Sequence, residues 1–332
     1  MTTALVDAYD AALFDLDGVI YLGPVAVEGA VATIAALARR GTRVMYVTNN
    51  AARSADTVVD HLARLGFETG PQDVLTSAQV AAVGIAEALP PGAKVLVAGS
   101  RNLADLLAEA GLTPVRSAEE EPVAVVQGYD PALPWSLLDE ACLAIQRGAT
   151  WYATNDDASR PTDRGTVPGA GGMIAVIATA LGGAPTTFGK PFRPMLAQAV
   201  RRVGARRPLF VGDRIDTDIV GANNASMDSL MVFSGAHGKA ELLAAGPGER
   251  PTHIGADVRA LLRPPRHVTV TDATTADCGG QRVGISDGVA RIETDPAALA
   301  EQFDALWALA ALAWLNPALA CDDALEQLDL VR

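Results

Sequence analysis

Short apolar runs alternate with helix-period segments through the first part of the chain. The run Ala11–Phe14 is entirely apolar, which is typical of a strand buried on both faces of a parallel sheet. Residues 27–40 place apolar side chains along one helical stripe, and Gly41 follows as a stop signal. Val44–Val47 is the next apolar run. These segments predict one β-α-β unit.

A second alternating series begins at about residue 79. Its apolar runs predict strands and its helix-period segments predict helices: Lys94–Ala98, Val123–Val126 and Trp151–Ala153 for the strands, Leu103–Ala110 and Trp135–Arg147 for the helices. Thr186–Phe188 and Leu209–Val211 then predict strands that return to the first series. Alternation of this kind predicts an α/β fold with a doubly wound parallel-sheet core.

The pattern changes after Pro264-Pro265. Short alternating runs follow, and Asp287-Gly288 between two of them predicts a β-hairpin. Asp295-Pro296 then opens a helix that runs to Leu315, in the order expected of a helix start. We therefore expect a small α+β extension over residues 265–332.

The predicted helix of this extension is apolar on nearly all faces, which implies burial. Trp307 and Trp314 are seven positions apart, so both indoles lie on one stripe of the helix. Such a stripe packs either on the rest of the chain or on a second subunit, which leaves a homodimer open.

Composition and charge narrow the classes of partner. The 332 residues carry a formal net charge of −13, whereas a nucleic-acid-binding protein usually presents a basic patch or stripe. An anionic substrate would therefore need local positive charge. The longest uncharged runs, 167–189 and 305–321, contain glycine or proline breaks and fall short of the ~20 apolar residues that a membrane span needs. The cysteines are scattered and no signal peptide is visible, so we expect a cytoplasmic protein.

Two carboxylates directly follow the first predicted strand. Asp15 and Asp17 stand at the carboxyl end of Ala11–Phe14, where ligands bind in open α/β sheets. Acidic residues also end strands in ordinary turns, so this pair alone is ambiguous.

Three further predicted strands also end in residues suited to phosphate or metal chemistry. Thr48-Asn49-Asn50 offers neutral hydrogen-bond donors, Gly189-Lys190-Pro191 fixes one lysine, and the segment from Asp213 to Asp218 adds carboxylates. A phosphate dianion beside so many carboxylates requires a cation, and an oxygen-rich set of ligands suits Mg²⁺. Four strand ends of this kind together predict a site for phosphate or metal chemistry rather than chance strand termini.

A nucleotide-dependent kinase is the competing interpretation of a lysine beside glycines. Five residues separate Gly183 from Gly189, rather than the four of a P-loop, and Pro191 replaces the serine or threonine that would hold Mg²⁺. These two departures exclude the kinase. A protein that binds a phosphometabolite without turnover is a second alternative, and we do not favour it because no catalytic position is lost.

The four motifs resemble those of the haloacid dehalogenase-type phosphatases, subfamily IIA, over about residues 8–262. The segments that carry the likeness are Asp15-x-Asp17-Gly18-Val19-x-Tyr21, Thr48-Asn49-Asn50, Gly189-Lys190-Pro191 and Gly212-Asp213-Arg214-x-x-Thr217-Asp218. Within the subfamily, the alanine-rich chain with its extension is most similar to actinobacterial glycerol 3-phosphate phosphatases. This implies glycerol 3-phosphate as the substrate, with phosphoglycolate, a sugar phosphate, pyridoxal phosphate or a nucleotide monophosphate as alternatives.

The resemblance also implies a role for each motif residue. Asp15 would be the nucleophile that forms a phospho-aspartate, and Asp17 the general acid and base. Asp15 and Asp213 would bind Mg²⁺ through their side chains and Asp17 through its backbone carbonyl, while Asp218 would complete the metal site by holding metal-bound water or orienting Lys190. The residues expected to bind the phosphoryl oxygens are Thr48, Asn49, Asn50 and Lys190.

The spacing of the motifs predicts an inserted cap domain, as in subfamily IIA. Thr48 lies 33 positions after Asp15, which is room for one β-α-β unit, but Lys190 lies 142 positions after Thr48. We expect the domains to be a phosphatase core over 1–78 and 183–264, an α/β cap over 79–182 and the extension over 265–332.

Arg160 is the cap residue expected to contact the substrate. It precedes Pro161, and in relatives the residue before that proline often contacts the substrate. The surrounding stretch is rich in Asp and Ser, which is also typical of a solvated turn.

Overall fold

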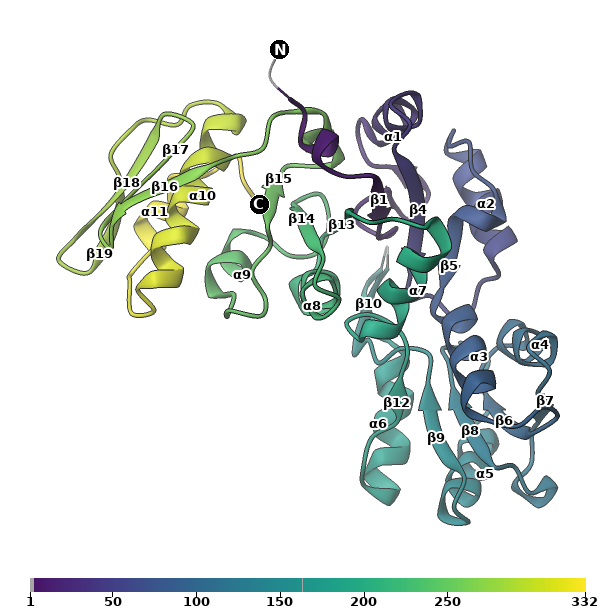
Figure 1. Cartoon of the computed structure of the whole chain (residues 1–332). Helices are drawn as coiled ribbons and strands as arrows, with labels where there is room; N and C mark the ends of the chain where they lie inside the picture. The colour runs from purple at the N-terminus through teal and green to yellow at the C-terminus, as the bar shows by residue number, and fades with distance from the viewer. Residues whose placement is uncertain (1–2, 163) are drawn as a thin grey trace. The chain divides into compact units, whose positions relative to one another are not determined.

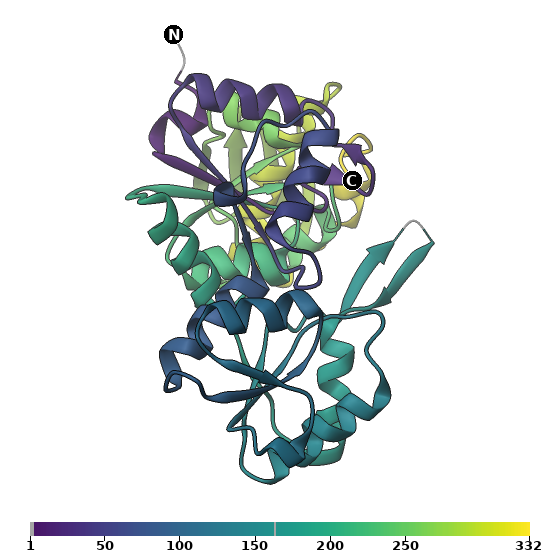
Figure 2. The same ribbon diagram turned by 90° about the vertical axis from the view of Figure 1, so that its right-hand side faces the viewer.

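The structure is a computed structural model that describes residues 3–162 and 164–332. The chain divides into two compact units, which are shown in two views in Figures 1 and 2. The first unit combines Met1–Val44 with Val203–Arg332, and the second unit is Met45–Arg202. The domain boundaries expected at residues 79, 183 and 265 stay a prediction.

Neighbouring parallel strands run through the first unit in the order β15 (His253–Gly255), β14 (Asp228–Val232), β13 (Pro208–Gly212) and β1 (Ala11–Phe14). Every residue of β1 is buried, as expected of an apolar strand inside a parallel sheet. The register places Phe14 opposite Val211, so β1 and β13 end side by side. Shorter elements complete this part of the unit: α1 (Ala30–Arg39), α8 (Val220–Asn224), α9 (Lys239–Ala244), β2 (Tyr21–Leu22), β3 (Val25–Ala26) and single turns at Leu5–Ala8, Ile215–Ile219 and Val258–Leu262.

A parallel sheet of its own forms the second unit. Its five strands lie in the order β12 (Thr186–Thr187), β9 (Thr150–Ala153), β8 (Ala124–Gln127), β6 (Lys94–Ala98) and β7 (Thr113–Val115). The helices are α2 (Ala55–Arg64), α3 (Ser77–Ala88), α4 (Arg101–Glu109), α5 (Trp135–Gln146), α6 (Ala170–Leu181) and α7 (Arg193–Val203), of which α7 ends at the unit boundary. The strand β4 (Arg43–Thr48) enters the unit and is parallel to β5 (Val74–Thr76), and β10 (Ser159–Thr162) pairs with β11 (Gly165–Pro168) as a hairpin.

The α/β class with parallel sheets is confirmed, but one strand was assigned to the wrong sheet. Thr186–Phe188 was expected to rejoin the first series of strands. In the structure β12 pairs with β9, through the partners Thr186 with Tyr152 and Thr187 with Ala153. A pairing of two residues leaves almost no pattern in the sequence, so the hydrophobic periodicity could not show which sheet this strand joins.

The extension belongs to the first unit and is drawn in yellow-green to yellow in Figure 1. Its antiparallel sheet has the order β16 (Val268–Asp272), β17 (Thr275–Cys278), β18 (Gln281–Ser286) and β19 (Val289–Ile292), and two helices follow, α10 (Leu299–Leu315) and α11 (Asp322–Glu326). Asp287 and Gly288 both have positive φ, at 52° and 76°, as the tight turn of the predicted hairpin requires. The α+β extension and its hairpin are therefore confirmed.

Helix α10 packs against the parallel-sheet part of the first unit. The rings of Phe303 and Phe233 meet edge to face, with centroids 5.0 Å apart. Trp307 and Trp314 also meet edge to face, at 5.4 Å, which confirms that both indoles lie on one stripe. The indole N–H of Trp314 donates to the carbonyl of Leu242 in α9, at 3.0 Å. The apolar stripe thus packs within its own unit, where Trp307 is buried and Trp314 partly buried. Across the described residues, none of the helices combines the length and the apolar character that crossing a membrane would need.

Replacing Phe303 by alanine should strongly destabilise the protein. Phe303 is 2% exposed and links the extension to Phe233, so Phe303→Ala leaves a cavity and should lower the free energy of unfolding by about 3–5 kcal/mol. Leu315→Ala is the matched control, because Leu315 ends the same helix and is 57% exposed. Urea unfolding followed by tryptophan fluorescence measures both variants; equal losses would show that α10 is not anchored through Phe303.

Candidate active site

The turn after β1 places Asp15 and Asp17 at the end of a buried strand. The backbone N–H of Asp15 donates to the carbonyl of Val211 at 2.9 Å, so Asp15 still continues the parallel pairing with β13. The chain then turns sharply, and Gly18 has a positive φ of 92°. A Cβ atom on Gly18 would lie 2.4 Å from Oδ2 of Asp213. A glycine is therefore required at position 18 for two reasons: the backbone has a positive φ, and the Asp213 carboxylate leaves no room for a side chain.

The turn after β13 brings two further carboxylates together. Oδ2 of Asp218 accepts hydrogen bonds from the backbone N–H groups of Asp213 and Arg214, both at 3.1 Å. Asp213 is 2% exposed and Asp218 is 1% exposed. Gly212 makes this approach feasible, because a Cβ atom there would lie 2.2 Å from Cβ of Asp218.

These two turns create a cluster of carboxylates. Asp15, Asp213 and Asp218 each offer one oxygen atom, and the three atoms lie within 4.8 Å of one another. Such a set of oxygen ligands fits Mg²⁺, which is bound in proteins by a few carboxylates and completes its shell with water and phosphate oxygens. The carboxylate of Asp17 is not in this group and its residue is exposed, and the contribution of its backbone carbonyl to the metal site stays a prediction.

A loop after β14 supports the cluster, and the sequence analysis did not identify it. The N–H of Ala236 donates to Oδ2 of Asp213 at 2.5 Å, and the N–H of His237 donates to the carbonyl of Asp213 at 3.2 Å. The hydroxyl of Ser234 donates to the carbonyl of Gly18 at 2.7 Å. The available signal was the small and polar run Ser-Gly-Ala-His-Gly after an apolar strand, at the same edge of the sheet as the acidic motifs.

Asp216 lies in the same acidic motif but has a different partner. Its two carboxylate oxygens accept hydrogen bonds from the guanidinium of Arg214, at 3.0 and 2.6 Å. Burial alone would raise the pKa of Asp216, but the hydrogen bond and the charge of Arg214, with a smaller effect of His237, lower it. Asp216 is therefore an ion-paired residue beside the cluster of Asp15, Asp213 and Asp218.

In the second unit, the side chain of Asn49 holds Lys190. Oδ1 of Asn49 accepts from the backbone N–H of Lys190 at 2.8 Å, and Nδ2 donates to the carbonyl of Lys190 at 2.9 Å. Nδ2 also donates to Oδ1 of Asp157 at 3.1 Å. Gly189 allows this contact, because a Cβ atom there would lie 2.7 Å from Oδ1 of Asn49.

This arrangement differs from the expectation that the Asn49 side chain donates to a phosphate. An amide group has two N–H donors, and in Asn49 both point at protein acceptors. The amide instead brackets the backbone of Lys190, whose residue is only 2% exposed. The structure thus shows how Asn49 contacts Lys190, while the predicted role of Asn49 in binding the phosphoryl group stays a prediction.

Thr48 and Asn50 form the turn after β4. The hydroxyl oxygen of Thr48 accepts from the N–H of Asn50 at 3.1 Å, and Oδ1 of Asn50 accepts from the N–H groups of Ala52 and Arg53 at 3.0 and 3.3 Å. In both side chains the oxygen is the acceptor, so the hydroxyl hydrogen and the amide hydrogens are available as donors. The contact of Thr48 and Asn50 with a phosphoryl group stays a prediction.

Arg160 lies on the hairpin strand β10 and is exposed. Its guanidinium carbon is 4.9 Å from the centroid of the Tyr129 ring, which is the geometry of a cation–π contact. The contact fixes the position of the side chain, while its role towards a substrate stays a prediction.

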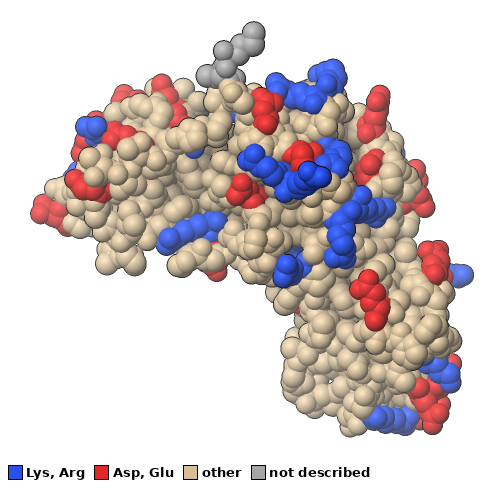
Figure 3. Space-filling model, in the orientation of Figure 1, with Lys and Arg blue, Asp and Glu red and all other residues tan. Residues whose placement is uncertain are grey.

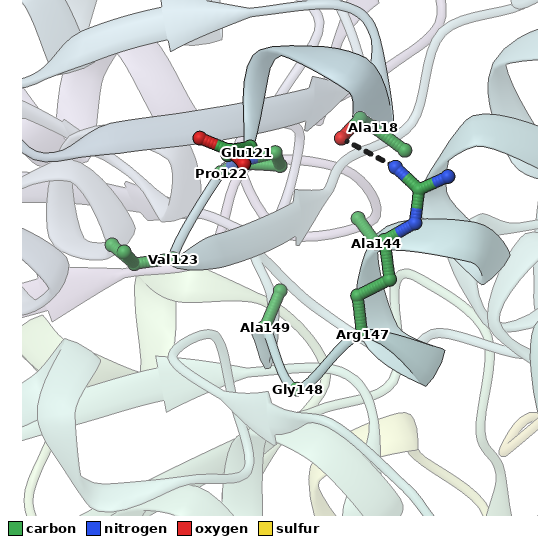
Figure 4. A pocket seen from close by; sticks show the side chains of 8 residues that line it. All are labelled: Ala118, Glu121, Pro122, Val123, Ala144, Arg147, Gly148 and Ala149. Carbon is green, nitrogen blue, oxygen red and sulfur yellow. Dashed lines mark hydrogen bonds between the residues drawn. The ribbon is translucent and has the colours of Figure 1, made fainter.

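A hollow on the surface of the second unit lies away from the predicted site residues. A hollow of about 360 Å³ in the second unit is lined by backbone and side chains near Arg147, whose guanidinium donates to the carbonyl of Ala118 at 2.9 Å (Figure 4). None of the predicted site residues lines it. On the face drawn in Figure 3, Lys and Arg are interspersed with Asp and Glu.

Comparison with known proteins identifies the family. Residues 12–113 match the family described as haloacid dehalogenase-like hydrolase, and residues 187–261 match a family described as HAD-hydrolase-like. The chain belongs to the haloacid dehalogenase-like hydrolases, as the four motifs predicted.

Among its relatives, the chain is 46% identical over 258 residues to D-glycerol 3-phosphate phosphatase of Mycobacterium tuberculosis, covering 78% of this chain and 72% of the relative. It is 36% identical to an acid sugar phosphatase of Staphylococcus aureus, covering 68% of this chain and 87% of that protein. The structure superposes on the crystal structure of glycerol phosphate phosphatase from Mycobacterium tuberculosis in complex with magnesium, with a TM-score of 0.88, 38% identity and 99% of both chains covered. A p-nitrophenyl phosphatase from Archaeoglobus fulgidus gives a TM-score of 0.71 at 26% identity, covering 76% of this chain and 98% of that one.

Adding a methyl group at Gly235 should weaken binding of a divalent cation. A Cβ atom there would lie 1.9 Å from Oδ2 of Asp213, so Gly235→Ala must displace the carboxylate. We expect about 10- to 100-fold weaker cation binding, as for other changes to groups that orient metal ligands. Gly248→Ala is the control, because a Cβ atom there would meet nothing within 4 Å. Isothermal titration with Mg²⁺ measures both; unchanged affinity in Gly235→Ala would separate Asp213 from the cation.

Proposed function

We propose that this hydrolase is a Mg²⁺-dependent phosphatase that cleaves small phosphate monoesters through a phospho-aspartate on Asp15. The observation that carries the proposal is the cluster of Asp15, Asp213 and Asp218, whose oxygens lie within 4.8 Å of one another. Three carboxylates at this distance need a counter-charge, and bound Mg²⁺ would offset their charge together with that of a substrate phosphate. The identity to phosphatases of this family supports the same reaction class.

The proposed reaction has two half-reactions. Asp15 attacks phosphorus, so that a bond forms between its carboxylate oxygen and phosphorus while the bond from phosphorus to the ester oxygen breaks. Asp17 donates its proton to the departing alkoxide. In the second half, Asp17 takes a proton from a water molecule, which attacks the same phosphorus and releases phosphate and the Asp15 carboxylate. The exposure of Asp17 suits a group that exchanges protons with substrate and water.

In the proposed reaction, residues of the second unit neutralise the charge of the phosphoryl group and contact the substrate. The buried ammonium of Lys190 and the hydroxyl of Thr48 would stabilise the equatorial oxygens of the transferring phosphoryl group, with Asn50 as a further donor. Asn49 would act by holding Lys190, because its amide brackets the backbone of that residue. Arg160 would contact the part of the substrate that leaves. The assignment of both units to one reaction rests on the order of the four motifs along the chain.

Glycerol 3-phosphate is the substrate that we propose. The support is the 46% identity to a D-glycerol 3-phosphate phosphatase, together with a superposition on a glycerol phosphate phosphatase that covers 99% of this chain and 99% of that one. The loop 155–161 has no aromatic residue that could stack on a nucleobase, which favours a polyol over a nucleotide. The cytoplasmic location and the homodimer stay predictions.

Replacing Asp15 and removing the metal test the proposed mechanism. Asp15→Asn keeps the shape of the side chain but is a poor nucleophile, so kcat for p-nitrophenyl phosphate should fall by at least about 1000-fold. Asp105→Asn, an exposed acid on α4, is the control and should turn over at the normal rate. The wild-type protein should also lose activity in EDTA and regain it with Mg²⁺. Near-normal turnover by Asp15→Asn would exclude the covalent mechanism. Binding of phosphate esters by the wild-type protein without any turnover would instead support the alternative of a non-catalytic binding protein.

A comparison of substrates tests the choice of glycerol 3-phosphate. Across a panel of phosphate esters, kcat/KM should be highest for glycerol 3-phosphate, followed by phosphoglycolate or a sugar phosphate. Inorganic phosphate release measures each member of the panel under the same Mg²⁺ concentration. A nucleotide monophosphate or pyridoxal phosphate that exceeds glycerol 3-phosphate by tenfold would contradict the assignment and leave the phosphatase proposal intact.

A further inference from the structure

The end of the extension contacts the loop that holds Asp213. The guanidinium of Arg332, at the chain end marked C in Figure 1, donates a hydrogen bond to the carbonyl of Gly235. The carbonyl of Arg332 accepts from the backbone N–H of Lys239 at 2.8 Å. The ammonium of Lys239 in turn donates to the carbonyls of Leu325 and Leu328, at 2.8 and 2.6 Å. The extension therefore forms hydrogen bonds with both ends of the segment 235–239, with Gly235 at one end and Lys239 at the other.

The same loop contacts Asp213 on its other side. The N–H groups of Ala236 and His237 donate to the Oδ2 atom and the carbonyl of Asp213, at 2.5 and 3.2 Å. The loop and the Asp213 carboxylate are in close contact, since a Cβ atom on Gly235 would lie 1.9 Å from Oδ2 of Asp213. A small displacement of the loop must therefore move a carboxylate oxygen of the acidic cluster.

The extension is itself firmly anchored, so it can fix the loop. Leu328 and Val331 are buried in the apolar cluster that α10 forms with the parallel-sheet part of the first unit. The buried amide of Gln302, on α10, donates to Asp329 at 2.7 Å and accepts from the N–H of Leu330 at 2.8 Å. The contacts form an unbroken series from α10 through residues 329–332 to the loop and then to Asp213.

We propose that Arg332 is a positioning residue for the metal site, so that the extension sets the affinity for the divalent cation. Arg332 touches no reacting atom and acts through Gly235 on the carboxylate of Asp213. This inference rests on the proposed function, because it assigns Asp213 to the cation. A merely structural role would instead make Arg332 a contributor to folding stability alone.

The test compares variants of the full-length chain. Arg332→Ala removes the guanidinium and keeps the backbone contact with Lys239. Arg332→Lys keeps a positive donor and should restore part of the effect. Arg282→Ala is the matched control, because Arg282 is an exposed residue of the same extension that pairs with Asp277 and contacts no part of the loop in the described residues.

Two measurements are made on each variant: binding of Mn²⁺ by electron paramagnetic resonance, and the Mg²⁺ concentration that half-activates turnover of p-nitrophenyl phosphate. Loss of one hydrogen bond to the loop should raise the Kd for Mn²⁺ and the half-activating Mg²⁺ concentration by about three- to tenfold in Arg332→Ala. The value of kcat at saturating Mg²⁺ should stay within about twofold, since the nucleophile is unchanged. Arg332→Lys should lie between Arg332→Ala and wild type, and Arg282→Ala should match wild type.

An unchanged Kd for Mn²⁺ in Arg332→Ala would overturn the inference, whatever happens to the melting temperature. Should Arg332→Ala be insoluble, a wild-type Kd in Arg332→Gln together with a lowered melting temperature would overturn it in the same way. A wild-type protein that binds Mn²⁺ but hydrolyses no ester would refute the proposed function, and the Mn²⁺ comparison would still decide the role of Arg332. Failure of the wild-type protein to bind Mn²⁺ would refute both.

Discussion

The repulsion among the carboxylates of Asp15, Asp213 and Asp218 is the constraint around which the first unit is arranged. Their oxygens lie within 4.8 Å of one another, and at about 5 Å two like charges repel by about 3 kcal/mol at an effective dielectric constant of about 20. The protein holds them together with backbone N–H donors and with glycines at positions 18, 212 and 235, where a Cβ atom would collide with an acidic side chain. Groups held together against such repulsion are pre-organised for a cation, since the binding energy of the ion is not then spent on gathering its ligands.

The positive charge that we propose for the reaction comes from the second unit. In a chain of net charge −13, a phosphate ester is repelled at long range, so a positive group must be fixed where the ester reacts. Lys190 is the group that we propose for this role, and it is only 2% exposed. The amide of Asn49 holds the backbone of Lys190 through both its N–H group and its carbonyl. In this proposal Asn49, after β4, supplies the positioning and Lys190, after β12, supplies the charge.

Much of this arrangement could be predicted because it follows local patterns. The buried strand Ala11–Phe14, the acidic residues after it and the Asp287-Gly288 hairpin each have a signature within a few positions of the chain. The use of the Asn49 amide could not be predicted, because it depends on the missing side chain of Gly189, 140 positions away. Contacts of this kind are decided by close packing between distant segments, and packing leaves no periodicity in the sequence.

The central claim is that Asp15, Asp213 and Asp218 hold one divalent cation, and diffraction tests it most directly. Crystals of the protein grown with Mn²⁺ should give a single anomalous peak at the manganese edge, about 2.1 Å from an oxygen of Asp15 and of Asp213, with Asp218 coordinating directly or through one water molecule. An anomalous peak elsewhere in the chain would contradict the account. So would the absence of Mn²⁺ from this cluster in a protein that Mn²⁺ activates.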